Sequence, residues 1–239
     1  MDMSPTTSLQ RPIRVLLLSL ALLCLPTSAS AFIYYANAIE ARVIDSQTGG
    51  PVQGAIVTAN WQLEGGFESG IAVDQLKILE TVTDVNGKFI IPAWGPKVSL
   101  RGHASFKWPQ ILVFKPGYKS LRLTNEPRSG SQFTTSSDWN AKTIALESFA
   151  GTLAEYVEHL SSLSSTLENV GYNIGDQSGD WCGWRSFPRM LRALDDLEAR
   201  LKSADVRQGT VVSFLRANET QVKEKGCGSV SEFLSGLRK

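Results

Sequence analysis

The sequence predicts a two-domain β + α fold, an antiparallel β-sandwich followed by a small helical domain stapled by a disulfide. Three observations lead to this fold class. Between residues 39 and 146, apolar and polar residues alternate in short segments separated by turn-forming residues, as in strands that bury one face. After residue 146, apolar residues recur every three or four positions, the period of amphipathic helices. Two cysteines, Cys182 and Cys227, lie in this second part.

Residues 1–31 have the layout of a signal peptide. Two arginines precede an apolar run from Val15 to Leu25, and the small residues Ala29–Ala31 follow it. The run is shorter than the roughly 20 apolar residues that a helix needs to cross a bilayer. We expect cleavage after residue 31, which leaves no transmembrane anchor. The alternative is an uncleaved anchor that extends through Phe32–Tyr35.

Composition and charge restrict the class of partner. Hydrophobic residues make up 42% of the chain and charged residues 20%, so most of it is expected to fold. Removal of residues 1–31 takes away two arginines and one aspartate, which brings the formal net charge from +1 to zero. A nucleic-acid binder needs a concentrated positive field, so the sequence argues against nucleic acid as a partner.

The mature chain retains two cysteines, Cys182 and Cys227. A signal peptide directs a protein to an oxidising compartment, where a disulfide between them is the natural interpretation. Two cysteines without nearby histidines are too few ligands for a structural zinc site. We therefore predict a periplasmic or secreted protein with one disulfide, no bound metal and no other cofactor.

Short strands of the sandwich are separated by clusters of glycine, proline and polar residues. No helical crossover of about a dozen residues lies between them, so antiparallel pairing is expected. Two longer stretches, residues 61–79 and 106–109, interrupt the pattern, and we expect both to project as loops. The expected strands comprise residues 39–44, 55–59, 88–91 and 111–114.

The segment Asp84-Val85-Asn86-Gly87 is open to two interpretations, a calcium loop or a tight turn. An EF-hand loop has glycine at its sixth position and glutamate at its twelfth. Counting from Asp84, glycine comes fourth and the twelfth residue is Gly95. The Asp84 side chain can instead accept hydrogen bonds from the backbone ahead of it, and Asn86 and Gly87 tolerate positive φ. A tight β-turn is the better interpretation.

Three motifs resemble the carboxypeptidase regulatory-like domain family: residues 45–57 (DSQTGGPVQGAIV), 81–89 (TVTDVNGKF) and 114–118 (FKPGY). The resemblance covers about residues 39–146 and implies a transthyretin-like β-sandwich. It also implies a module that occurs beside an enzyme, or independently of one, in extracytoplasmic proteins. Residues 148–239 resemble no family that we recognise. The residues expected to turn the chain are Gly49, Pro51, Gly54, Asp84, Asn86, Gly87 and Gly117.

Three tryptophans and a histidine lie in or beside the expected loops. Exposed aromatic rings can stack on sugars or anchor a protein partner, so these are the candidate contact residues for a ligand or partner. The alternative is that they cap the ends of the sandwich. The four residues are Trp61, Trp94, Trp108 and His103.

The second part carries the apolar stripes of several helices. Pro188 suits the first turn of one of them, and Ser229 followed by Glu232 has the spacing of a capping box for a short last helix. We therefore divide the chain into a signal peptide (1–31), a sandwich (32–147) and a helical domain (148–239). The longer expected helices cover residues 153–170, 190–201 and 210–223.

The sequence shows no recognisable catalytic motif. The mature chain has two histidines, His103 and His159, and lacks both a His-Glu-x-x-His pair and a Gly-x-Ser-x-Gly elbow. We therefore expect no enzyme but a non-catalytic interaction or assembly module that binds an envelope or extracellular protein. The alternative is a carbohydrate-binding module in which the sandwich tryptophans stack on a glycan.

Overall fold

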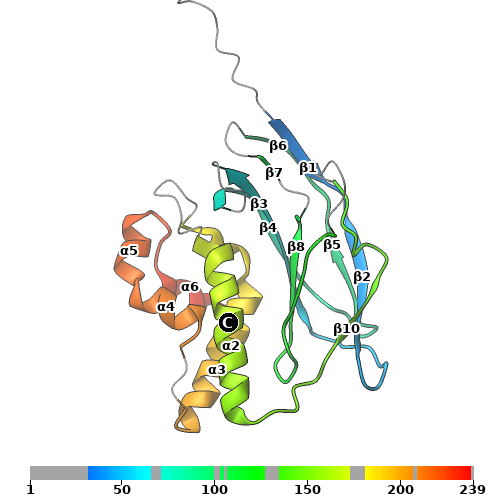
Figure 1. The fold of residues 1–239 in the computed structure, drawn as a ribbon. Coiled ribbons are helices and arrows are strands. Elements are labelled where there is room, and N and C mark those ends of the chain that lie inside the picture. Colours follow the sequence, from blue (N-terminus) through cyan, green and yellow to red (C-terminus); the bar gives the residue numbers. More distant parts are fainter. Residues whose placement is uncertain are drawn as a thin grey trace, which may run out of the picture.

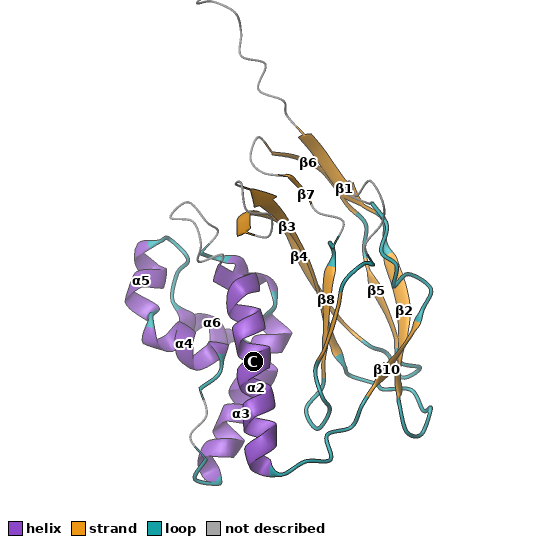
Figure 2. Ribbon diagram, in the orientation of Figure 1, coloured by secondary structure: helices purple, strands orange, loops and turns teal. Residues whose placement is uncertain are grey.

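The computed structural model describes residues 32–65, 71–99, 103–104, 107–126, 135–172, 181–206 and 209–237. These residues form three layers, namely a small sheet, a larger sheet, and helices on the outer face of the larger sheet (Figure 1). Figure 2 shows the strands on one side of the molecule and the helices on the other. The predicted fold class, a β part followed by a small disulfide-stapled helical part, is confirmed. The predicted signal peptide, residues 1–31, lies outside the described residues.

The small sheet contains β2 (Ile39–Asp45), β5 (Lys88–Ile91) and β10 (Thr143–Leu146), in the order β10-β2-β5. β2 pairs with β5 antiparallel, whereas β10 pairs with β2 in parallel. A parallel pair is possible here because β2 and β10 are not joined by a hairpin: the strands from β3 to β9 lie between them in the chain. The predicted antiparallel pairing holds for every other strand pair in the described part of the chain.

The larger sheet centres on β3 (Ile56–Gly65), which is buried along all of its 10 residues. Alternate residues of β3 from Val57 to Leu63 join the core between the two sheets, while Ile56 joins the core beneath the helices. The strand order is β4-β3-β8-β9, and β7 also pairs with β3. The other strands are β4 (Ile71–Val82), β7 (His103–Ala104), β8 (Gln110–Phe114) and β9 (Leu121–Leu123).

The stretch 61–79, expected to project as a loop, instead extends β3 and β4 into a long hairpin. The pairs run from Ile56 opposite Val82 to Gly65 opposite Ile71. The strand does alternate in sequence, since apolar residues at 57, 59, 61 and 63 are separated by polar ones. The loop expectation was wrong because it took a stretch longer than a tight link between strands as the sign of a loop. In the other expected loop, the described residues 107–109 lead into β8, and Trp108 is buried.

The helices pack on the larger sheet through a continuous apolar core. One cluster joins Ile56, Ile78 and Phe114 of the sheet with Leu160 and Leu167 of α2. The helical part therefore shares a core with the sandwich, on the face that the small sheet leaves open. The helices are α2 (Leu153–Tyr172), η1 (Gly183–Ser186), α3 (Pro188–Ser203), α4 (Val211–Ala217), α5 (Glu219–Glu224) and α6 (Val230–Gly236).

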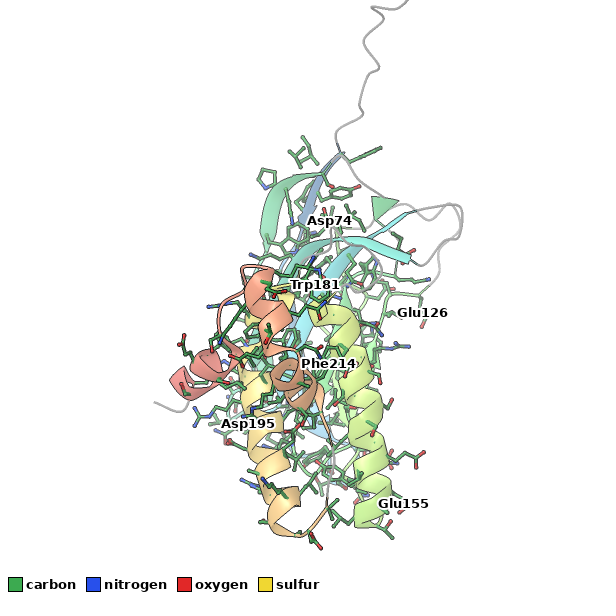
Figure 3. All side chains as sticks on the ribbon, turned by 90° about the vertical axis from the view of Figure 1, so that its left-hand side faces the viewer. Asp74, Glu126, Glu155, Trp181, Asp195 and Phe214 are labelled. Atoms are coloured by element: carbon green, nitrogen blue, oxygen red, sulfur yellow. A yellow bond between two sulfur atoms is a disulfide. The ribbon has the colours of Figure 1, made fainter. Side chains whose placement is uncertain are left out.

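Cys182 and Cys227 form the predicted disulfide, with an S–S distance of 2.05 Å. It joins the residue before η1 to the segment before α6. Trp181, labelled in Figure 3, lies next to the bridge in the chain, and the Lys225 ammonium lies 5.1 Å from the centre of its ring. Trp184 is fully buried in the core beneath the helices.

Asp84 closes the tight turn between β4 and β5. Its Oδ1 accepts hydrogen bonds from the backbone N–H groups of Asn86 and Lys88, both at 2.8 Å. Gly87 has a φ of +73°, and a Cβ placed on it would lie 2.3 Å from the carbonyl oxygen of Val43. The turn is therefore seated directly against β2. Gly49, Gly54 and Gly117 also have positive φ, and Pro51 forms a β-bridge with Ile44.

We expect Gly87→Ala to lower the free energy of unfolding by about 2–5 kcal/mol, measured by urea denaturation. The left-handed backbone strains any residue with a Cβ, and the new methyl group would collide with backbone that cannot move aside. Gly49→Ala is the matched control, since Gly49 has a φ of +69° and nothing lies within 4 Å of a Cβ placed there. Its expected cost is about 1–2 kcal/mol, and equal losses in the two variants would contradict the collision.

Candidate functional site

The structure places the predicted contact residues mostly inside the sandwich. Trp61 is 0% exposed and Trp108 is 9% exposed, and Trp94 is half-buried against the same core. The rings of Trp61 and Trp94 meet edge to face, with centroids 5.4 Å apart. Trp61 faces inward because it lies at one of the alternate β3 positions that fill the core. The side chain of His103 lies outside the described part of the structure.

Trp61 and Trp108 thus belong to the core between the sheets, and they offer no exposed ring to a sugar. Trp94 keeps part of its surface accessible. Glycan binding through these residues stays a prediction.

Exposed apolar side chains gather instead on a two-stranded ribbon of β1 (Phe32–Ala36) and β6 (Trp94–Ser99), beyond one end of the sandwich (Figure 1). Ile33 is 63% exposed and lies opposite Val98, which is 59% exposed. Of the seven large hydrophobic side chains that are exposed among the described residues, four lie on this ribbon. Ile33, Tyr35 and Val98 share one face, whereas Phe32, at the start of β1, lies on the face of Tyr34. We call these four side chains, Phe32, Ile33, Tyr35 and Val98, the apolar ribbon.

The other face of the ribbon is anchored to the protein. Tyr34 and Ala36 are buried in the sandwich core, with 5% and 4% of their surface exposed. The Lys97 ammonium donates hydrogen bonds to the carbonyl oxygens of Gln75 at 2.7 Å and Leu76 at 2.9 Å. These bonds tie β6 to β4, so the exposed side chains stand on a fixed support.

The two strands approach each other closely at Gly95. This residue has a φ of +114°, and a Cβ placed there would lie 2.5 Å from the Cβ of Tyr35. Sequence reasoning missed the apolar ribbon because it weighed Phe32–Tyr35 only as an extension of the apolar N-terminal run. The signal in the sequence was that β1 is apolar at successive positions. A strand of this kind is either buried on both faces or exposes one apolar face.

Ser120 and His159, 39 residues apart in sequence, meet at the boundary between the sheet and α2. Nε2 of His159 accepts the backbone N–H of Ser120 at 2.7 Å and lies 3.1 Å from the Ser120 hydroxyl. Burial, and then the positive charge of Lys119, lowers the pKa of His159. Because the backbone N–H occupies the Nε2 lone pair, this nitrogen is not free to take the hydroxyl proton of a nucleophile. The pair serves as a link between the β8–β9 connection and α2.

Glu80 makes a second link between sheet and helices. Its carboxylate oxygens accept the backbone N–H groups of Arg189 and Met190 at the start of α3, each at 2.8 Å. Burial raises the pKa of Glu80 to about 7, while the two hydrogen bonds favour the anion and oppose that rise. A perturbed carboxyl group often marks an active site, but here both oxygens are occupied by the backbone of α3.

Neither a cluster of metal-binding side chains nor a membrane-spanning helix occurs among the described residues. No group of three or more His, Cys, Asp or Glu side chains is placed there to hold a metal ion. None of the helices in the described segments combines the length and the apolar character that a membrane span requires. That the protein binds no cofactor and catalyses no reaction stays a prediction.

No protein-family model matches the chain, and no curated protein matches it. Among solved structures it is similar to 3-chlorocatechol 1,2-dioxygenase from Rhodococcus opacus 1CP, with 19% identity over 50% of this chain and 62% of that chain, and a TM-score of 0.30. A streptococcal ancillary pilin shares 10% identity over 48% of this chain and 30% of the pilin, with a TM-score of 0.25. A 9R-lipoxygenase from Cyanothece PCC8801 shares 13% identity over 78% of this chain and 32% of the lipoxygenase, with a TM-score of 0.25. The chain spans less than two thirds of each of these proteins, and scores this low assign neither a family nor a function.

Proposed function

We propose that the protein is a non-catalytic interaction or assembly module of the periplasm or the extracellular space. Its contact surface is the apolar ribbon, and its sandwich is of the carboxypeptidase regulatory-like type. The observation that carries the proposal is the ribbon itself, which exposes Ile33, Tyr35 and Val98 on one face while Tyr34 and Ala36 bury the other, with exposed Phe32 at the end of β1. The disulfide and the predicted signal peptide support the location, because disulfides persist in oxidising compartments.

The partner that fits this surface is another protein with an apolar face. Burying a large apolar side chain contributes about 1.5–3 kcal/mol, so covering the ribbon would provide much of the free energy of association. The ribbon is smaller than a standard interface of about 1,600 Å². The partner must therefore also cover the polar surface around the ribbon, with the apolar side chains at the centre of the contact.

Site-specific photo-crosslinking in intact cells tests the proposal. A photoreactive amino acid replaces Tyr35 in one variant and Val85 in the control, which is 64% exposed and lies on the turn that ends at Gly87. The expected result is an adduct with one protein at position 35 and no such adduct at position 85. The double variant Ile33→Ser/Val98→Ser should lower the affinity for that partner at least tenfold, since each lost contact of about 1.4 kcal/mol is a factor of ten.

Stability provides the control for this experiment. Both substituted side chains are more than half exposed, so each substitution is expected to change the free energy of unfolding by about 0.5 kcal/mol or less. Equal labelling at positions 35 and 85 would contradict the proposal. An adduct of two copies of this chain, or a partner that binds the folded double variant with unchanged affinity, would contradict it as well.

A further inference from the structure

A second surface, separate from the apolar ribbon, also has the chemistry of a binding site. It is a groove of about 840 Å³ on the small sheet, lined from β2, β5 and the residues that lead into β10. The small sheet lies on the side of the molecule away from the helices (Figure 1). A smaller hollow of about 490 Å³ shares Lys142 and Thr143 with this groove and continues toward Trp139.

Three cations line the groove. Arg42 on β2 lies directly opposite Lys88 on β5. On the other side of β2, Thr143 of β10 pairs with Arg42, and the third cation, Lys142, immediately precedes Thr143. Like charges that face each other across two strands repel. Within the described residues, none of the three cations forms an ion pair with a carboxylate. An anionic ligand would relieve this repulsion.

The groove also contains carboxylates and an apolar side chain. Asp84 is engaged by its own turn, because its Oδ1 accepts two backbone N–H groups. Glu40 lies two residues before Arg42 on β2, opposite Ile90 on β5. Ile90 is 56% exposed. The groove is therefore cationic at the Arg42–Lys88 pair, while the Glu40–Ile90 pair presents one carboxylate and one apolar side chain.

The backbone of the preceding loop fixes the position of Lys142. Ala141 has a φ of +59°, its N–H donates to the carbonyl oxygen of Glu40 at 2.7 Å, and the Arg42 N–H donates to the carbonyl oxygen of Lys142 at 3.0 Å. A positive φ costs a residue with a Cβ about 1–2 kcal/mol. Residues held in such conformations cluster at ligand sites, and this one turns the chain into the groove.

We propose that the groove binds an extended acidic segment of a protein, with its carboxylates on Arg42, Lys88 and Lys142 and an apolar side chain on Ile90. Alternate side chains of an extended segment lie about 7 Å apart on one face. The Arg42–Lys88 and Glu40–Ile90 pairs are also two residues apart along their strands, so the spacings match. A small inorganic anion would neutralise the cations but leave Ile90 in contact with water. This site goes beyond the proposed function and does not depend on the apolar ribbon.

Fluorescence anisotropy with a labelled peptide of alternating glutamate and valine tests the inference on the protein with its disulfide intact. A lysine–valine peptide of equal length is the control probe. The variant Arg42→Gln/Lys88→Gln removes two charges from the groove, and Lys77→Gln/Lys202→Gln removes two exposed charges elsewhere. We expect the groove variant to bind the acidic peptide at least tenfold more weakly and the control variant to bind it normally. Raising the salt from about 0.05 M to about 0.5 M should weaken binding, because it shortens the screening length.

Three results would overturn the inference: equal loss of binding in the two double variants, equal binding of the acidic and the basic peptide, or no binding of the acidic peptide. Citrate that binds as tightly as the peptide would assign the groove to a small anion and would also overturn it. Ile33→Ser/Val98→Ser is expected to bind the acidic peptide normally, so failure of this inference and failure of the ribbon proposal give different results.

Discussion

Removal of the Cys182–Cys227 disulfide is expected to lower the free energy of unfolding by about 4 kcal/mol. The two cysteines are separated by 45 residues, and the chain-entropy model gives this value for a loop of that length. Most of the enclosed segment is helical and contributes α3, α4 and α5 to the core beneath the helices. The measurement is urea unfolding of the oxidised protein and of the Cys182→Ala/Cys227→Ala variant, with circular dichroism as the signal of unfolding.

The same experiment tests the shared core. Because the helices and the larger sheet bury one apolar cluster, we expect a single transition that moves to lower urea when the bridge is absent. The parent protein treated with reductant is the control and should follow the double variant. A loss below about 1 kcal/mol, well under the usual range, would contradict the prediction, as would separate transitions for strands and helices.

Trp61→Ala is expected to lower the free energy of unfolding by about 3–5 kcal/mol, the usual cost of removing a buried tryptophan ring. The ring of Trp61 is 0% exposed, and it packs edge to face on Trp94 in the core between the sheets. Its removal would leave a cavity there that the two sheets cannot fully close. Urea unfolding at neutral pH gives the value directly.

Tyr35→Ala is the control for this substitution, because it also removes an aromatic ring from a strand, but one that is 52% exposed. We expect that variant to lose less than about 1 kcal/mol. If Trp61→Ala were as stable as Tyr35→Ala and failed to bind a glycan that the parent protein binds, Trp61 would be a surface residue. The carbohydrate-binding alternative would then replace the interaction module.

The helices and their caps were predicted well from the sequence. The Ser229–Glu232 capping box forms as expected, since the Ser229 hydroxyl accepts the Glu232 N–H. The helix expected over 153–170 is α2, Leu153–Tyr172. The helix expected over 210–223 begins after its cap Thr210 but is divided at Asn218 into α4 and α5. Each of these helix predictions depends on residues within one or two turns of each other.

The features that sequence reasoning missed depend on contacts between distant segments. The polar side chains on the outer face of β3 are buried, although their chemistry alone would place them in water; they are Thr58, Asn60, Gln62 and Glu64. Trp61 is a core residue because it lies on the opposite face of β3, which the small sheet covers, although the length of its segment suggested a loop. The links from Ser120 to His159 and from Glu80 to α3 likewise join residues 39 to 110 positions apart. No local pattern contains such information.

The apolar core beneath the helices also restricts how this protein can be divided or recombined in evolution. A sandwich that ended after β10 would present Ile56, Ile78, Leu112 and Phe114 to water, and these are the side chains that α2 and α3 now cover. An uncovered apolar sheet face of this kind invites aggregation. The sandwich is therefore not a free-standing unit that could be exchanged between genes by itself. The helices have to be inherited together with the sheet that they cover.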